Sequence, residues 1–170
     1  VDTISSHLAK LHFEDEQRIW YYDAELPRTQ LPFWQEHKVW TWLTLSDNQV
    51  QQLNFSTTDF IPSTPVKSFV RLISNAGNIT SQTHKHGSSI NSATVQDSIT
   101  FDYRRTVNFI SNYSSDQLLT GNNVFRVFGL PTAALFHRSL IDWIEIDYYR
   151  QNKALNDSLL IYIPDSLTAS

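Results

Sequence analysis

Apolar and polar residues alternate in several segments of the chain, and turn residues separate these segments. Alternation with a period of two is typical of strands that bury one face, because successive side chains of a strand point to opposite sides. Within residues 66–73, Val70 and Leu72 would face one way and Phe69 and Arg71 the other. The pattern predicts strands over residues 39–43, 50–55, 66–73, 105–110, 124–128, 140–149 and 159–163.

Turn signals and weak helical signals complete this pattern. Gly121 can supply a positive φ in a turn, and a neighbouring Asn side chain can bond backbone groups there. Residues 75–78 indicate another turn, and helical signals are limited to a short turn within residues 3–13 and one capped turn at residues 114–119. Many short strands separated by turns predict an all-β sandwich or barrel, here as a single domain spanning residues 1–170.

Aromatic side chains supply much of the apolar volume, since the 170 residues include five Trp, seven Tyr and ten Phe. The net charge of −4 comes from interspersed charges without a basic stripe, so we expect no nucleic-acid partner. No apolar run is long enough to cross a bilayer, and we expect no membrane insertion. The absence of cysteine excludes a disulfide scaffold, a thiol nucleophile and a thiolate metal site.

His84 and His86 form the most suggestive local motif. Two histidines at positions i and i+2 of a strand share a face and can share a metal ion, as in the cupin class of enzymes. The glutamate that a cupin places a few residues later is missing, because Ile90 and Asn91 occupy that region. We therefore favour two imidazoles in a polar β-turn over a metal site, and we keep both histidines as candidate ligand contacts.

Acidic residues gather at positions 14–16 and again at Asp142, Glu145 and Asp147. The chain has no Gly-x-Ser-x-Gly motif and only four glycines, so neither a nucleophile elbow nor a phosphate-binding loop is predicted. We interpret the acids as solvated rather than catalytic, and we expect no enzyme activity. Asp142 differs because the alternation places it on the apolar face of its strand, where a carboxylate must be hydrogen-bonded or bind a cation. Backbone N–H groups are the favoured partners there, and a structural calcium ion is the alternative.

Three tryptophans lie close together at positions 34, 40 and 42. Exposed aromatic rings on a sandwich can stack on sugar rings. Trp40 and Trp42 share one face of their predicted strand, which favours a place in the core over a sugar platform. Trp34 lies close to Pro32 in a loop-like stretch and is the tryptophan that we expect to be exposed and to contact a ligand.

Several segments follow one another in the order found in a known module. They are residues 11–15 (LHFED), 37–42 (HKVWTW), 83–86 (THKH), 118–124 (LLTGNNV) and 140–150 (LIDWIEIDYYR). Together they resemble the β-sandwich domain that precedes the catalytic domain of gingipain-type cysteine peptidases, which are sortase-like peptidases of the type IX secretion system in Bacteroidetes. The chain departs from that pattern at Thr83, at Asn91-Ser92 and at Tyr149, where the family has an acid, an Asn-Gly turn and a proline.

This resemblance implies a jelly-roll, galactose-binding-like β-sandwich of two antiparallel sheets. It also implies a non-catalytic accessory module that is secreted, periplasmic or attached to the cell surface. Its partner would be an adjacent peptidase-like domain or that domain's protein substrate. Because the chain begins with Val1 rather than Met, we expect a processed fragment of a larger exported protein.

Carbohydrate-binding jelly rolls share two of these features, an L-x-x-G-x-N hairpin at residues 118–123 and a D-x-I-E-I strand at residues 142–146. The alternative function is therefore a carbohydrate-binding module with a glycan as its partner. A histidine-dependent metalloenzyme of the cupin type is the third hypothesis, and it depends on His84 and His86.

Overall fold

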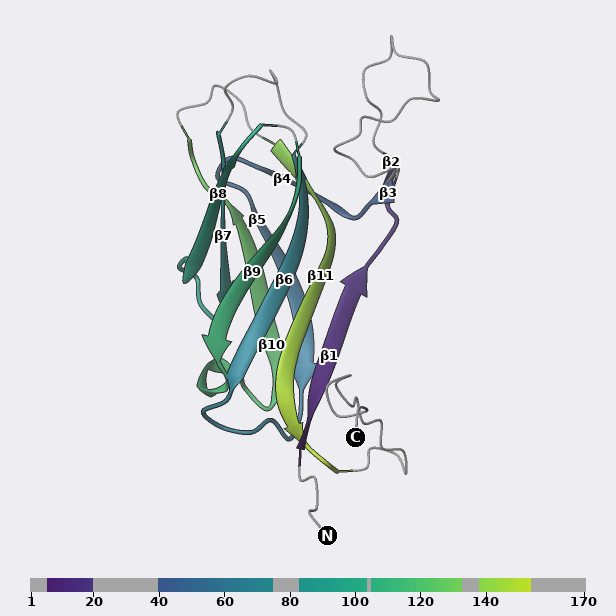
Figure 1. The fold of residues 1–170 in the computed structure, drawn as a ribbon, viewed down its shortest axis with the longest axis vertical. Helices are drawn as coiled ribbons and strands as arrows, with labels where there is room; N and C mark the ends of the chain where they lie inside the picture. Colours follow the sequence, from purple (N-terminus) through teal and green to yellow (C-terminus); the bar gives the residue numbers. More distant parts are fainter. Residues whose placement is uncertain (1–5, 20–39, 75–82, 104, 133–137, 154–170) are drawn as a thin grey trace, which may run out of the picture.

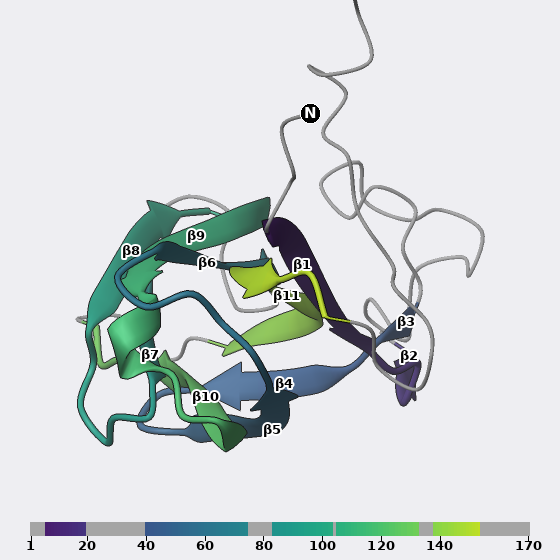
Figure 2. The same ribbon diagram turned by 90° about the horizontal axis from the view of Figure 1, so that it is seen from below.

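The computed structural model describes residues 6–19, 40–74, 83–103, 105–132 and 138–153. Apart from one 3₁₀ turn, the regular structure in these ranges is made of strands, and two antiparallel sheets pack face to face (Figures 1 and 2). The strands are β1 (Ser6–Glu14), β2 (Arg18–Ile19), β3 (Trp40–Thr41), β4 (Leu43–Ser46), β5 (Val50–Thr57), β6 (Pro65–Ser74), β7 (Thr83–Ile90), β8 (Asp97–Asp102), β9 (Thr106–Ser114), β10 (Gly121–Gly129) and β11 (Arg138–Gln151). The 3₁₀ turn spans Ser115–Gln117. The predicted all-β sandwich of two antiparallel sheets is confirmed.

Each sheet brings together strands that are far apart in the sequence. One sheet has the order β1-β11-β6-β9, and β4 joins it by pairing with the first residues of β11. The second sheet has the order β5-β10-β7-β8, and β2 and β3 form a small separate pair. Seen along the strands, the two large sheets form two layers, with the core between them (Figure 2). β10 and β11, which follow each other in the sequence, therefore do not pair and lie in opposite sheets.

Alternating residues of β6 and β10 supply much of this core. Val66, Val70 and Leu72 point inward from β6, and Phe125 and Val127 point inward from β10. All five are at most 1% exposed. Full burial of an aliphatic or aromatic side chain stabilises a fold by about 1.5–3 kcal/mol, so this face of each strand fixes its orientation. The predicted division of β6 into two faces is confirmed: Val70 and Leu72 lie on one face, which points into the core, and Phe69 and Arg71 lie on the other.

A register shift in β11 moves Asp142 out of the core. The pairing of β11 with β6 shifts between Ile141 and Ile144, as at a β-bulge, and both isoleucines remain in the core. Asp142 lies instead on the outer face, where its Oδ2 is 3.5 Å from Nε of Arg71. The prediction that Asp142 interrupts the apolar core face is therefore wrong. Regular alternation cannot anticipate a bulge, which places two residues of one strand opposite one residue of its neighbour.

Three other segments differ from their predictions. A short helical turn is predicted within residues 3–13, but residues 6–14 form strand β1. His84 and His86 are predicted in a polar turn, but they belong to strand β7. Trp42 is a bend between β3 and β4, so the two tryptophans do not share one strand face. As a result Trp40 is 39% exposed, whereas Trp42 packs against the core. Strand β8 was not predicted, and the predicted turn at 75–78 and strand at 159–163 lie outside the described residues.

The structure confirms two of the predicted turns. The capped turn is the 3₁₀ turn, in which the Ser114 side chain accepts a hydrogen bond from the backbone N–H of Asp116. Gly121 has a φ of +92°, and the Asn123 side chain bonds the backbone around it. The Asn123 amide donates to the carbonyl oxygens of Leu119 and Gly121, and its Oδ1 accepts from the Leu119 N–H at 2.7 Å. It also donates to Thr57 Oγ1, so the turn is tied to β5.

Asn123→Ala is expected to lower the free energy of unfolding by about 2 kcal/mol. Asn123 is 1% exposed, so the change leaves several buried backbone and side-chain groups without their hydrogen-bond partner. Urea denaturation of the variant measures this loss. The control is Asn122→Ala at the exposed neighbouring position, for which we expect a change below about 0.5 kcal/mol. Equal losses for the two variants would contradict the role given to the Asn123 side chain.

Candidate functional site

The two histidines of the sequence motif lie in the core. His84 and His86 are both 0% exposed and share the inward face of β7, as two residues at i and i+2 should. Both rings contact Phe101, with centroids 5.1 Å away for His84 and 5.8 Å for His86. The Nε2 atom of His86 is 2.9 Å from Oγ of Ser139 on the opposite sheet. The expectation that these residues form a polar turn is wrong, and neither imidazole is placed to contact a surface ligand.

The other candidate residues do not form a metal centre. In the described ranges, no group of three or more His, Cys, Asp or Glu side chains is close enough to hold a metal ion. The Asp142 carboxylate, proposed for structural calcium, faces the Arg71 guanidinium, and a cation beside it would meet like charge. Asp142 therefore does not fit a calcium site. Trp34, the predicted exposed tryptophan, lies outside the described residues.

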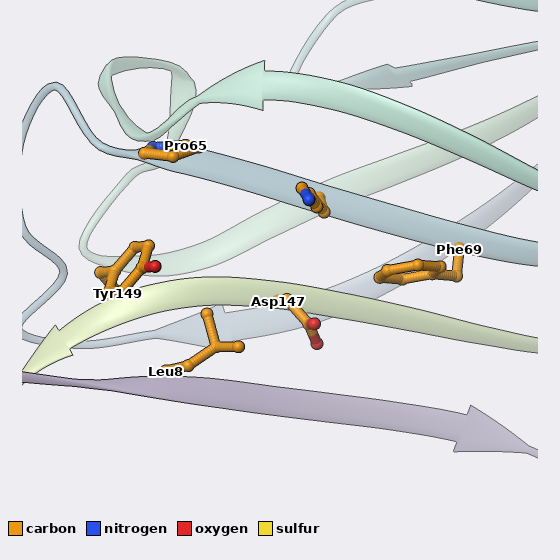
Figure 3. Close-up of a pocket in the computed structure, with 6 residues that line it drawn as sticks. Leu8, Pro65, Phe69, Asp147 and Tyr149 are labelled. Atoms are coloured by element: carbon orange, nitrogen blue, oxygen red, sulfur yellow. The ribbon is translucent and has the colours of Figure 1, made fainter. Parts of the chain in front are cut away.

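A pocket with mixed chemistry lies instead on the outer face of the β1-β11-β6-β9 sheet. Its volume is about 230 Å³. Strand pairing builds it, because Leu8 lies opposite Tyr149 and Lys67 lies opposite Asp147. In Figure 3 the Asp147 side chain lies between those of Tyr149 and Phe69. The residues that line the pocket are Leu8, Pro65, Lys67, Phe69, Asp147 and Tyr149.

Asp147 is the unusual group in this pocket because its carboxylate is almost completely buried. The residue is 6% exposed, and no donor in the described part of the chain bonds its Oδ1 atom. Its Oδ2 atom is 3.4 Å from Nζ of Lys10, which also donates to Glu145 Oε1 at 3.0 Å. Burial raises the pKa of the Asp147 carboxyl, and the nearby Lys10 ammonium opposes that rise. A buried carboxylate oxygen without a hydrogen bond destabilises the fold unless something else satisfies it.

The walls of the pocket are apolar or aromatic, and Lys67 adds a hydrogen-bond donor. Tyr149 is 39% exposed and Phe69 is half-buried, so part of each ring can contact a ligand. Lys67 is exposed, and its ammonium forms no ion pair with any described residue. Asp147 is the one carboxylate among the six lining residues, whereas glycoside hydrolysis usually uses a pair of carboxylates. This arrangement suits binding through ring contacts and hydrogen bonds.

The sequence contained part of the signal for this pocket. Asp147 was recognised as one of a group of acids, but its interpretation as a solvated side chain is wrong, because β1 and β6 flank it and Lys10 lies beside it. The alternation in β11 places Asp147 and Tyr149 on the face opposite to Ile146 and Tyr148. The missing information was the register, which places Leu8 and Lys67 beside these two residues.

Asp147→Asn is expected to change how stability depends on pH. The pKa of Asp147 is raised above its ordinary value near 3.8, so the folded state holds this proton at pH values where the unfolded chain has released it. The folded wild type therefore loses stability as the pH rises from about 3.8 through the raised pKa. Asparagine does not titrate, so the stability of the variant relative to the wild type should increase across that window and then level off. Urea denaturation at a series of pH values measures it, and a difference that is constant with pH would contradict this view of Asp147.

Comparison with known proteins identifies the fold. No family model matches the chain, and no curated protein matches its sequence. The CBM36-1 domain of a multidomain xylanase from the hindgut metagenome of Trinervitermes trinervoides superposes with a TM-score of 0.51 at 12% identity, covering 81% of this chain and 96% of that domain. A carbohydrate-binding module CBM36 in complex with calcium and xylotriose gives a TM-score of 0.49 at 17% identity, covering 80% of this chain and 98% of that one. The first likeness shows a shared jelly-roll β-sandwich. Within the described ranges, no helix has the length and apolar character needed to cross a membrane.

Proposed function

We propose that this chain is a carbohydrate-binding module whose ligand enters the outer-face pocket. The observation that carries the proposal is that one pocket is lined both by the exposed Tyr149 ring and by Asp147, whose buried Oδ1 atom has no donor among the described residues. A sugar ring has apolar C–H faces that pack on aromatic rings and hydroxyl groups that donate to carboxylates. The pocket offers a surface for each of these parts of a sugar.

The size of the pocket and the fold both support this proposal. A volume of about 230 Å³ is below the range of about 300–1,000 Å³ that is usual for drug-sized ligands, so it suits one sugar ring of a longer chain. Pro65, Lys67 and Tyr149 are exposed at the pocket and can be reached by a ligand from solvent. The sandwich itself is shared with the CBM36-1 domain of a xylanase. The binding of a glycan requires no catalytic group from this chain.

Tyr149→Ala is expected to weaken glycan binding at least about tenfold, which corresponds to about 1.4 kcal/mol. The change removes the ring surface on which the sugar would pack. The wild type is first tested on a broad glycan array, and the best ligand is then titrated by calorimetry in calcium and again in EDTA. Val50→Ala removes an exposed apolar side chain from β5 in the other sheet, and it should bind like the wild type.

Two results would count against the proposal in different ways. An array on which no glycan binds the wild type would exclude carbohydrate binding. A glycan that binds the wild type and Tyr149→Ala with equal affinity would show that the binding site lies elsewhere on the molecule. Binding that occurs in calcium but is lost in EDTA would show that a metal ion takes part in binding. The described acidic residues form no group that could hold such an ion.

The resemblance to the peptidase-associated module supports a second role, in which the sandwich packs against a peptidase-like domain of an exported protein. Its most specific segment, residues 140–150, forms most of β11, the strand that pairs with β1, β4 and β6. The segment therefore has a structural role in the sandwich that requires no chemistry of its own. Peptide hydrolysis by the isolated chain would contradict this role.

A further inference from the structure

The pocket has three chemically different parts in a fixed arrangement. Leu8, Pro65 and Tyr149 form an apolar end, and Phe69 lies at the other end (Figure 3). Asp147 lies between them with an oxygen that lacks a donor in the described part of the chain. Lys67, directly opposite Asp147 in the strand pairing, adds an ammonium group without an ion-pair partner among the described residues. The pocket thus offers an apolar surface, an acceptor and a donor to a single ligand group.

The charges around Asp147 disfavour a charged ligand. Glu145 and Asp147 on β11 carry two negative charges, and Lys10 on β1 and Lys67 on β6 carry two positive charges. His12, the other nearby titratable group on β1, faces Glu14 and Glu145 rather than the pocket. A ligand ammonium would meet two lysines, and a ligand carboxylate would meet two acids. The balance favours a neutral group with its own donor and acceptor.

We propose that the pocket binds the acetamido group of an N-acetylated sugar, an inference that rests on the proposed carbohydrate-binding function. The amide N–H donates to Asp147 Oδ1, the amide carbonyl accepts from Lys67 Nζ, and the methyl group packs on Leu8, Pro65 and Tyr149. A plain hydroxyl in the same position satisfies Asp147 but leaves the apolar end and Lys67 without contacts. A site that bonds the polar groups of a ligand and packs on its apolar group binds that ligand about 10–100-fold more tightly than an analogue that lacks these groups.

Matched sugars test this inference separately from the function itself. The probes are oligosaccharides of equal length and linkage in the gluco and galacto series, each with an acetamido, an amino or a hydroxyl group at the same ring carbon. We expect the acetamido form of at least one series to bind about tenfold or more tightly than its amino and hydroxyl forms. Equal binding of acetamido and hydroxyl forms, or a preference for the amino form, overturns the inference and leaves carbohydrate binding intact. No binding of any sugar on the broad array overturns both.

Lys67→Met tests the assignment of the groups. The change keeps an apolar stem but removes the donor to the amide carbonyl, and an exposed position should tolerate it. We expect the ratio of acetamido to hydroxyl affinity to fall at least about fivefold, with little change in affinity for the hydroxyl form. Lys85→Met, at an exposed position of β7 in the other sheet, should keep the wild-type ratio. An unchanged ratio in Lys67→Met overturns the proposed placement of the acetamido group.

Discussion

Gly129→Ala is expected to lower the free energy of unfolding by about 3 kcal/mol or more, the largest effect among the described glycines. Gly129 ends β10 where the turn between β4 and β5 crosses it. Its N–H donates to the Gln49 carbonyl, and its own carbonyl accepts from the Asn48 N–H. A Cβ atom at this position would collide with the backbone carbonyl of Ser46, which cannot rotate away as a side chain can.

Two other glycines serve as graded controls for this prediction. A Cβ on Gly87 would meet methyl groups of Val95, which are side-chain atoms that can shift. A Cβ on Gly121 would meet nothing within 4 Å, so Gly121→Ala suffers only from its φ of +92°, at about 1–2 kcal/mol. Urea denaturation of the three alanine variants measures the series. A loss for Gly129→Ala no greater than that for Gly121→Ala would show that the β4–β5 turn moves freely away from β10.

Arg71→Leu is expected to destabilise the fold by about 3 kcal/mol, because it removes the cation beside a buried carboxylate. Asp142 has 3% of its side chain exposed, whereas Arg71 has 21% exposed and also donates to Asn108. The pair is therefore asymmetric, since Arg71 can turn to water when its partner is lost but Asp142 cannot. We expect Asp142→Asn to be clearly less damaging than Arg71→Leu.

The double variant Arg71→Leu/Asp142→Asn completes this test. If the loss in Arg71→Leu comes from the Asp142 carboxylate losing the nearby guanidinium charge, removing the carboxylate charge as well should restore part of the stability. Thermal denaturation at constant pH and salt gives the four values of the cycle. Additive losses would show that the 3.5 Å contact between the two groups contributes no coupling.

The strand content of this protein could be predicted wherever the alternation was regular. β5, β6, β9, β10 and β11 were all located from it, because each buries one face against the opposite sheet. β7 could not be recognised, because the residues that it points inward include His84, His86 and Ser88. These polar side chains are accommodated by contacts inside the core, such as that between Ser88 and the Tyr113 hydroxyl at 2.6 Å. A pattern method that treats such residues as solvent-facing predicts a turn at this position.

The candidate pocket could be predicted only in part, for a reason of geometry. Alternation shows which residues of one strand share a face, and it correctly placed Phe69 on the face of β6 opposite to Val70 and Leu72. The pocket, however, also needs Leu8 from β1 and Asp147 from β11, and these become neighbours only through the register of strands distant in sequence. The ion pair between Lys10 and Glu145, which are 135 residues apart, shows the same dependence. The sequence around one strand does not show which residues of a distant strand will pair with it.

Asp147 also links the stability of the fold to its proposed function. Its carboxyl is buried at a position where burial disfavours the charged form, so an uncharged residue of similar shape should give a more stable protein near neutral pH. Residues that are retained at the expense of stability are common at binding sites. Comparing Asp147→Asn with the wild type therefore measures two effects of the carboxylate, namely the stability that the fold loses and the glycan affinity that it gains.

The pairing of β1 with β11 has a consequence for biosynthesis. β1 is the first described strand to leave the ribosome and β11 is the last, yet each residue from Ser6 to Glu14 has its partner on β11. Until β11 emerges, the inward side chains of β1 and one edge of β6 remain uncovered, and β4 also lacks its partner. Strand pairings between such distant segments form slowly. The sheet that carries the pocket can therefore be completed only after β11 has been synthesised.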